Sequence, residues 1–280
     1  MHVPPYNNRN KPLFEVGNEA VPLTYFNIVN LKKGEKFTYK ILGFETCIVP
    51  ATGSISVAIN NFFVAEIGKR KSDVWDDEPE GVYAPTGLDV NFVALSDTVE
   101  VFIAGAKCDE VYDPFVISSS DIDFVQYGSD DTKTHRKIKH ILGQKQNGKV
   151  GRLLVSELYT VGQGGWSGFP PHKHDTDRKP TETQHDEVYN FRFKPDHGFG
   201  LQLLQQDGKK IGDAFHLINK STVAIPSGYH PCVVAPGYEM YYFTILAGLS
   251  QRPLIQYFQP DHDWQVNIIP GIKDMIAKFK

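Results

Sequence analysis

Cysteine is scarce in this sequence of 280 residues. Only Cys47, Cys108 and Cys232 occur, far apart and without a Cys-x-x-Cys pair. Their number and spacing argue against a disulfide-stabilised scaffold and against a zinc–thiolate site, and they favour a reducing compartment. Long apolar runs are missing too, because no stretch approaches the roughly 18 apolar residues of a membrane helix, and the N-terminus has no apolar signal segment. We therefore expect a cytoplasmic protein with no membrane partner.

A large excess of charge is also absent. The chain has 29 Lys and Arg against 33 Asp and Glu, a formal net charge of −4. This balance gives no electrostatic reason to expect a nucleic-acid partner. Hydrophobic residues make up 41%, which is close to the average for globular proteins. The composition therefore predicts a folded protein.

Helical periodicity is nearly absent. Only residues 271–280 place apolar side chains at helical spacing, which predicts a short C-terminal helix. Short runs rich in Val, Ile, Phe, Tyr and Thr instead recur between Gly, Pro, Asn and Asp, a pattern typical of all-β sandwiches or barrels. The predicted strands are 23–29, 45–50, 54–59, 90–95, 100–104, 152–159, 188–193, 200–205, 222–226 and 241–246.

The two halves of the chain repeat weakly. A Pro-Thr-Gly turn at 85–87 and a Pro-Ser-Gly turn at 226–228 each precede a strand that ends in Ala-Gly. Duplication of one β-barrel is the economical interpretation. We place the division near residue 145, with a degenerate barrel and linker in 1–145 and a second barrel with a C-terminal tail in 146–280.

A candidate metal site lies in the second half, at His172, His174, Glu187 and His230. Side chains alternate along a strand, so the two histidines of His172-Lys173-His174 project to one face. Glu187 opens a strongly β-like run, and His230 follows the Pro-Ser-Gly turn. Three nitrogens and one oxygen suit Zn, Mn, Fe, Co or Ni and leave positions for water or substrate. The spacing thus predicts a catalytic site for one divalent metal, with Zn preferred.

Neighbouring residues refine this site. Glu182 is a rival carboxylate, but it and His185 lie in a polar loop and are expected to face solvent. Tyr189 shares strand parity with Glu187 and should face inward, either to transfer a proton or to pack. The first half has Leu88-Asp89 where the second has Tyr229-His230, and its only histidine before residue 131 is His2. We expect no second metal site there.

The fuller pattern of the second half resembles a known family. It comprises Pro170-Pro171-His172-Lys173-His174-Asp175, Glu187-Val188-Tyr189, Gln202, Ile225-Pro226-Ser227-Gly228-Tyr229-His230-Pro231 and Tyr241-Tyr242. It is similar to the 5-deoxy-glucuronate isomerases of myo-inositol catabolism, which are bicupins. The resemblance implies two cupin barrels of jelly-roll type, metal on His172, His174, Glu187 and His230, and substrate contacts from Gln202, Tyr229 and Tyr241. One departure is Leu203, where the family usually has Arg.

The implied reaction is an aldose–ketose isomerisation of 5-deoxy-D-glucuronate to a 5-dehydro-2-deoxy-D-gluconate type product through an enediolate. Glu187, Tyr189 or a metal-bound hydroxide could move the proton. A metal-dependent cupin dioxygenase and a non-catalytic sugar-binding cupin stay open as alternatives, because fold and ligands alone do not separate them. Exposed sheet edges would permit a homo-oligomer.

Overall fold

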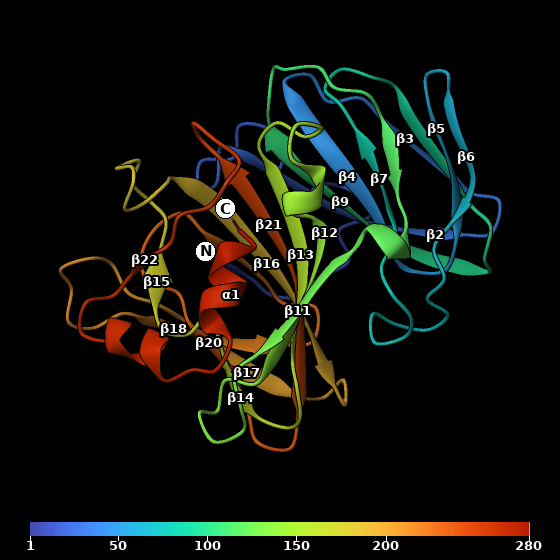
Figure 1. Ribbon diagram of the computed structural model, residues 1–280. Coiled ribbons are helices and arrows are strands. Elements are labelled where there is room, and N and C mark those ends of the chain that lie inside the picture. Colours follow the sequence, from blue (N-terminus) through green and yellow to red (C-terminus); the bar gives the residue numbers. More distant parts are fainter. Residues whose placement is uncertain (280) are drawn as a thin grey trace.

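The computed structural model describes residues 1–279, and strands dominate it (Figure 1). The strands of the first half form a five-stranded sheet, in the order β10-β7-β4-β9-β2, and a four-stranded sheet, β3-β8-β5-β6. Their bounds are β2 Thr24–Lys32, β3 Lys36–Tyr39, β4 Phe44–Thr52, β5 Ile55–Ile59, β6 Phe62–Ile67, β7 Gly81–Ala84, β8 Val90–Ala94, β9 Thr98–Lys107 and β10 Phe115–Ile117.

The second half forms a seven-stranded sheet, β1-β19-β16-β21-β13-β12-β11, a four-stranded sheet, β14-β20-β17-β18, and the pair β15-β22. Their bounds are β1 His2–Val3, β11 Asp123–Tyr127, β12 Arg136–Leu142, β13 Leu153–Thr160, β14 Gly165–Ser167, β15 His172–Lys173, β16 His185–Lys194, β17 Phe199–Leu204, β18 Asp213–Ile218, β19 Thr222–Ile225, β20 Cys232–Val234, β21 Glu239–Gly248 and β22 Tyr257–Phe258. Single-turn 3-10 helices cover Ser119–Asp121, Gln144–Gln146 and Asp263–Asn267, and the helix α1 covers Ile272–Ala277.

Each predicted strand run overlaps an observed strand, and the predicted helix at 271–280 is found at Ile272–Ala277, with residue 280 outside the described residues. Strand β10 belongs to the five-stranded sheet of the first half, whereas β11 and β12 form an edge of the seven-stranded sheet of the second half. The chain therefore passes from one set of sheets to the other between β10 and β11, before residue 145. The N-terminal strand β1 also joins that sheet, where His2 pairs with Val223. No helix within residues 1–279 is long and apolar enough to cross a membrane.

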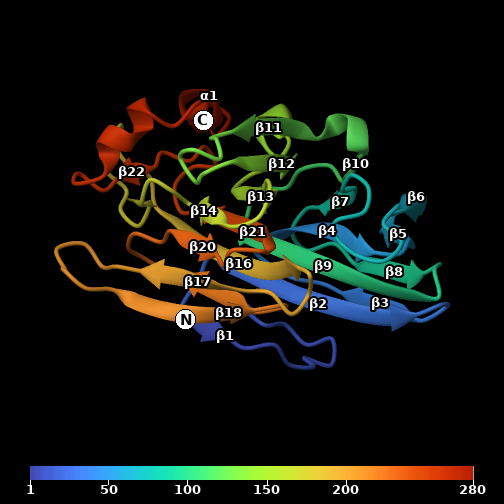
Figure 2. The ribbon, with the colours of Figure 1, turned by 90° about the horizontal axis from the view of Figure 1, so that it is seen from below.

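The sheets stack in layers, and three apolar cores fill the spaces between them (Figure 2). The middle core joins the two halves: Phe26 and Phe102 of the first half pack with Phe243 of β21, and the rings of Phe102 and Phe243 are 4.8 Å apart. The seven-stranded sheet thus buries one face against the first half and its other face inside the second barrel. This explains why β16 and β21 are buried almost throughout, whereas β5 and β8 alternate.

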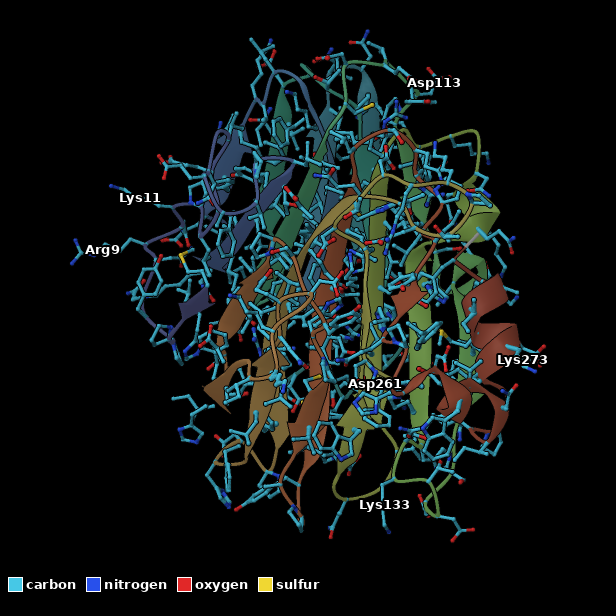
Figure 3. The ribbon with its side chains drawn as sticks, turned by 90° about the vertical axis from the view of Figure 1, so that its left-hand side faces the viewer. Arg9, Lys11, Asp113, Lys133, Asp261 and Lys273 are labelled. Atoms are coloured by element: carbon cyan, nitrogen blue, oxygen red, sulfur yellow. The ribbon has the colours of Figure 1, made fainter. Side chains whose placement is uncertain are left out.

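Buried polar contacts also hold the halves together. The carboxylate of Glu45 accepts hydrogen bonds from the backbone N–H groups of Gly151, Arg152 and Leu153, at 2.9, 2.6 and 2.7 Å, and from the hydroxyl of Tyr83. Charged side chains such as Arg9, Lys11, Asp113 and Lys273 lie at the periphery (Figure 3). The first barrel therefore acts as a rigid backing for the sheet that carries the site.

Candidate metal centre

Three buried histidines converge inside the second barrel. His172 lies on β15, His174 follows that strand, and His230 lies in the turn before β20. Each side chain offers a ring nitrogen, and these atoms all lie within 4.8 Å of one another. Within residues 1–279 this is the one group of three or more His, Cys, Asp or Glu with such a spacing. In the first half, Leu88-Asp89 occupies the positions that correspond to Tyr229-His230.

The hydrogen bonds of the three rings orient them for a metal. The Nδ1 atom of His172 lies 3.2 Å from the carbonyl oxygen of Pro170, that of His174 lies 3.1 Å from the carbonyl of His185, and that of His230 lies 2.8 Å from the carbonyl of Gly228. A carbonyl oxygen only accepts, so each Nδ1 must carry the proton. In a neutral imidazole the Nε2 atom then presents a lone pair, which is how histidine ligands are commonly oriented.

Glu187 of β16 completes the set. Its Oε2 lies 3.1 Å from Nε2 of His174 and 3.2 Å from Nε2 of His230, while its Oε1 accepts a hydrogen bond of 2.9 Å from the hydroxyl of Thr244. Nε2 of His230 is buried and has no hydrogen-bond partner. Lone pairs of two imidazoles and a carboxylate that face one another out of water need a cation between them. The donor set therefore fits a divalent metal.

The electrostatics of the ligands agree with this reading. Burial, together with the charges of His230 and His174, holds the pKa of His172 well below its ordinary value, so the ring is neutral. Burial alone would raise the pKa of Glu187, but its close contacts with His174 and His230 outweigh burial and lower that pKa. Both groups are thus in the deprotonated forms that bind metals.

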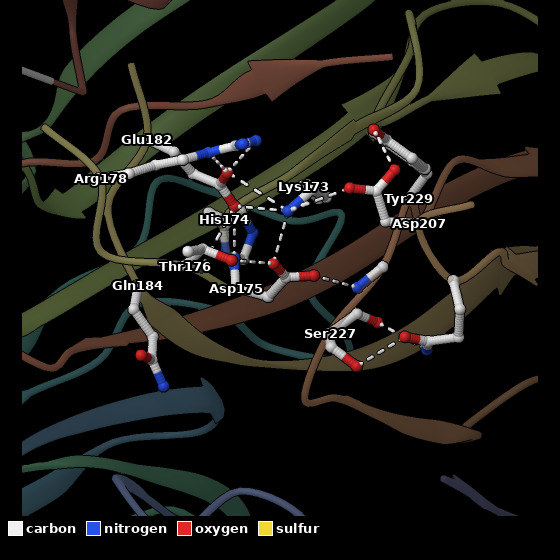
Figure 4. A network of polar contacts seen from close by, with 12 residues as sticks. Lys173, His174, Asp175, Thr176, Arg178, Glu182, Gln184, Asp207, Ser227 and Tyr229 are labelled. Atoms are coloured by element: carbon white, nitrogen blue, oxygen red, sulfur yellow. Dashed lines mark hydrogen bonds and ion pairs between the residues drawn. The ribbon is translucent and has the colours of Figure 1, made fainter. Parts of the chain in front are cut away.

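The rival carboxylate, Glu182, has another role. It is fully buried and accepts hydrogen bonds from Nζ of Lys173, at 3.0 and 3.2 Å, and from the guanidinium of Arg178 (Figure 4). Lys173 also donates to Asp175, whose second oxygen accepts from the backbone N–H of Gly228 at 2.8 Å. This network ties the His172–His174 segment to the turn that carries His230.

The expectation that Glu182 and His185 face solvent is therefore wrong. His185 is 1% exposed, and its Nε2 lies 3.1 Å from the carbonyl oxygen of Arg252. Residues 176–181 of this loop are exposed, but Glu182 and His185 can be buried because Glu182 pairs with Lys173 and Arg178 and His185 meets a backbone carbonyl. The burial of His185 depends on Arg252, which lies 67 positions later in the chain, and no local pattern predicts that contact.

A cavity of about 40 Å³ adjoins the ligands, which is room for an ion and a water-sized group. Tyr189 lines it, as strand parity predicted, and so do Tyr242, Gln256 and Phe258. Nε2 of Gln256 lies 3.0 Å from Nε2 of His172. A six-carbon acid needs more space, so binding requires side chains of this wall to move, and Gln256 is one of the wall residues in contact with a ligand.

The residues expected to bind substrate lie elsewhere. Gln202 uses its amide nitrogen to donate to the carbonyl oxygen of His230 at 2.7 Å. The hydroxyl of Tyr229 donates to Asp207 at 3.3 Å. Tyr241 belongs to the core between the halves, where its hydroxyl donates to Glu157 at 2.9 Å. The structure brings none of the three to the cavity wall and places Tyr242, next to Tyr241, there instead.

Sequence reasoning missed Thr244 and Gln256. Strand parity could have found Thr244, because Thr244 and Tyr242 share a face of β21. The position of Thr244 beside Glu187 depends on the pairing of β16 with β21, in which Thr244 lies opposite Tyr189. Gln256 precedes β22, which pairs with β15, and no local pattern predicts that pairing.

The chain was compared with known proteins. The model described as the KduI/IolB family matches residues 2–265. Two relatives named 5-deoxy-glucuronate isomerase are similar: that of Bacillus subtilis strain 168 is 31% identical over 261 residues, covering 92% of this chain and 94% of the relative, and that of Geobacillus kaustophilus is 32% identical over 259 residues, covering 92% and 91%.

Solved structures are also similar to this chain. An IolB-like protein from Salmonella typhimurium LT2 superposes with a TM-score of 0.80 at 30% identity, over 86% of this chain and 89% of that one. An oxalate decarboxylase from Lactobacillus farciminis has a TM-score of 0.62 at 10% identity, over 97% and 94%, and shares the fold. The expected all-β, two-barrel cupin fold is confirmed. On the family match and the identity to these relatives, the chain belongs to the KduI/IolB family.

Proposed function

We propose that this protein is a metal-dependent isomerase that converts 5-deoxy-glucuronate into the corresponding ketose acid. The observation that carries the proposal is the convergence of three imidazole lone pairs and the Glu187 carboxylate beside a cavity. The names of the relatives supply the substrate. An aldose–ketose isomerase must stabilise negative charge next to a carbonyl and must move a proton between adjacent carbons.

His172, His174, His230 and Glu187 would hold the metal, and we propose Zn²⁺. The ion would supply Lewis-acid stabilisation of the charge that develops on two adjacent substrate oxygens. Thr244 restrains Glu187 through Oε1, and the three backbone carbonyls restrain the imidazoles. Preorganised ligands of this kind need no rearrangement during the reaction.

Tyr189 and Glu187 are the proposed proton-transfer groups. Tyr189 lies against the cavity, and burial together with the Glu187 charge raises its pKa well above the ordinary value. A hydroxyl that stays protonated near neutral pH is suited to donate a proton to a developing alkoxide rather than to abstract one. Abstraction of the substrate proton is assigned to Glu187, which is the carboxylate among the four ligands and lines the cavity.

The substrate contacts are assigned to the cavity wall. Gln202 holds the backbone of His230 and so positions a ligand. Tyr242 and Gln256 face the cavity and are the proposed partners of substrate hydroxyl groups. We further expect a cytoplasmic enzyme, in line with its three buried free thiols, and a homo-oligomer.

The test joins metal analysis with turnover. Purified protein should contain about one divalent ion per chain and should isomerise 5-deoxy-glucuronate. His172→Ala should lose both properties, whereas His197→Ala, which alters an exposed histidine, should keep them. The proposal is wrong if His172→Ala retains metal and turnover. Oxygen consumption without isomerisation would favour a dioxygenase.

A further inference from the structure

We propose that Arg136 binds the carboxylate of the substrate, an inference that rests on the proposed function for the identity of that substrate. Arg136 opens β12 and its side chain is fully buried. One of its nitrogens, Nη2, donates to the carbonyl oxygen of Phe169 at 3.0 Å. Its Nε and Nη1 are buried and have no hydrogen-bond partner.

Of the four buried arginines among the described residues, two pair with carboxylates, and Arg252 uses all three of its nitrogens to donate to carbonyl or amide oxygens. Arg70 pairs with Glu157 at 2.7 Å, and Arg192 pairs with Glu100 at 2.7 Å. Within residues 1–279 no carboxylate oxygen lies within 4.0 Å of Arg136. Arginine keeps its charge in proteins, and a buried charge is costly unless it is paired. A bound anion would supply the acidic partner that the protein itself does not provide to Arg136.

The position of Arg136 connects it to the cavity beside the metal ligands. It shares a face of β12 with Ile138, which lines that cavity. Its guanidinium carbon lies 4.8 Å from the ring centre of Tyr127. Tyr127 and the half-buried Phe169 both contact the guanidinium and both line the cavity. Arg136 lies behind these two residues and is not itself part of the cavity lining, so a carboxylate reaches its unpaired N–H groups once one of the two side chains moves aside.

The ring of Tyr242 continues the path toward the metal ligands. Tyr242 packs on Tyr189 with ring centres 4.5 Å apart, and Tyr189 lies 6.3 Å from the ring of His230. A sugar acid needs its two ends held in different ways, the carbonyl end by a cation and the carboxylate end by a donor pair. The His cluster provides the first kind of group at the cavity, and Arg136 provides the second behind the cavity wall formed by Tyr127 and Phe169.

Other cations near the ligands are already paired. Lys173 is bound by Asp175 and Glu182. Leu203, which stands where the family usually has Arg, lies on the face of β17 opposite to the buried Gln202 and Leu204. The departure at Leu203 therefore removes no cation from the barrel interior. Among the described residues, Arg136 is the cation with donors to spare on the interior face.

The experiment compares binding of two inert probes, glucuronate and glucose, which differ in a carboxylate against a hydroxymethyl group. Calorimetry on metal-loaded and on metal-stripped protein gives the preference for the acid. We expect a preference of about tenfold or more in the wild type, the size of a charge-assisted hydrogen bond. In Arg136→Met the preference for glucuronate over glucose should fall to about twofold or less. Arg136→Lys should keep part of this preference, because lysine retains the positive charge but lacks the forked geometry of the guanidinium.

The matched control is Arg192→Met. Arg192 is also buried, but it pairs with Glu100 of the first half, which keeps a second cation in Lys220 at 2.9 Å. This variant should keep the full preference for the acid. Equal binding of both probes by the wild type, or an unchanged preference in Arg136→Met, overturns the inference.

The two proposals fail separately. A wild-type protein that turns over no uronate, but prefers glucuronate in a manner that depends on Arg136, refutes the isomerase and keeps the carboxylate site. Turnover of 5-deoxy-glucuronate by the wild type with the same acid preference in Arg136→Met refutes the carboxylate site alone. Binding of the probes requires no catalysis, so each result is readable without the other.

Discussion

The hydrogen bond from Thr244 to Glu187 should control metal affinity. Its oxygen atoms are 2.9 Å apart, and both side chains are at most 4% exposed. Replacing Thr244 with Val keeps the shape of the side chain and removes one donor. Oε1 of Glu187 then has no hydrogen-bond donor, and the carboxylate can rotate away from the histidines.

Loss of a group that orients a metal ligand typically lowers metal affinity 10- to 100-fold. In Thr244→Val we therefore expect the metal Kd to rise by about that factor, which corresponds to about 1.4 to 2.7 kcal/mol. The assay is a titration of metal-stripped protein in competition with a chromogenic chelator, and unfolding in urea reports the stability of the same samples.

Thr222→Val is the matched control. Thr222 is fully buried and accepts a hydrogen bond of 2.8 Å from Asn190, on the face of the sheet turned away from the ligands. It should lose about 1 kcal/mol of stability and keep its metal affinity. A folded Thr244→Val protein with a metal Kd within about twofold of the wild type would refute the role of this hydrogen bond.

Three further predictions follow from the same structure. Burial lowers the pKa of His140 to about 4, so its contribution to stability is complete above pH 6.5 and falls as the pH drops to 4. Between pH 7.5 and pH 5, metal-stripped wild type should lose about 2 kcal/mol more than His140→Gln in urea unfolding, and equal losses would contradict this. Glu45→Ala removes the acceptor of three buried N–H groups and should cost about 3 kcal/mol or more, measured by the same method; a cost below about 1 kcal/mol would show that the halves do not depend on it. Glu187→Gln should abolish tight metal binding, whereas Glu182→Gln should weaken it only indirectly, and the reverse order in the chelator titration would exchange their roles.

Much of the site follows from local spacing. The His172-Lys173-His174 pattern places two imidazoles on one side of an extended segment and Lys173 on the other, and the structure has that arrangement. The choice of Glu187 over Glu182 rested on Glu187 opening a strand, and β16 begins two residues before it. Strand parity also predicted that Tyr189 faces inward.

Other parts required contacts between distant segments. Strands β11 and β12 were missed because their sequence is mixed, with alternate residues of β11 exposed at the edge of a sheet. Their pairing brings Arg136 to the barrel interior, 36 positions before His172 in the chain. Tyr242, rather than the expected Tyr241, lines the cavity because of which face of β21 meets the first half.

The sequence by itself predicted the family, the all-β class and a candidate ligand set, because strand alternation and turn chemistry act over a few residues. The tertiary structure decided which polar groups are paired. It buried Glu182 in an ion network, set Thr244 behind Glu187, and left the guanidinium of Arg136 without an acid. Pairing depends on the register between strands far apart in the chain, and a list of residues does not contain that register.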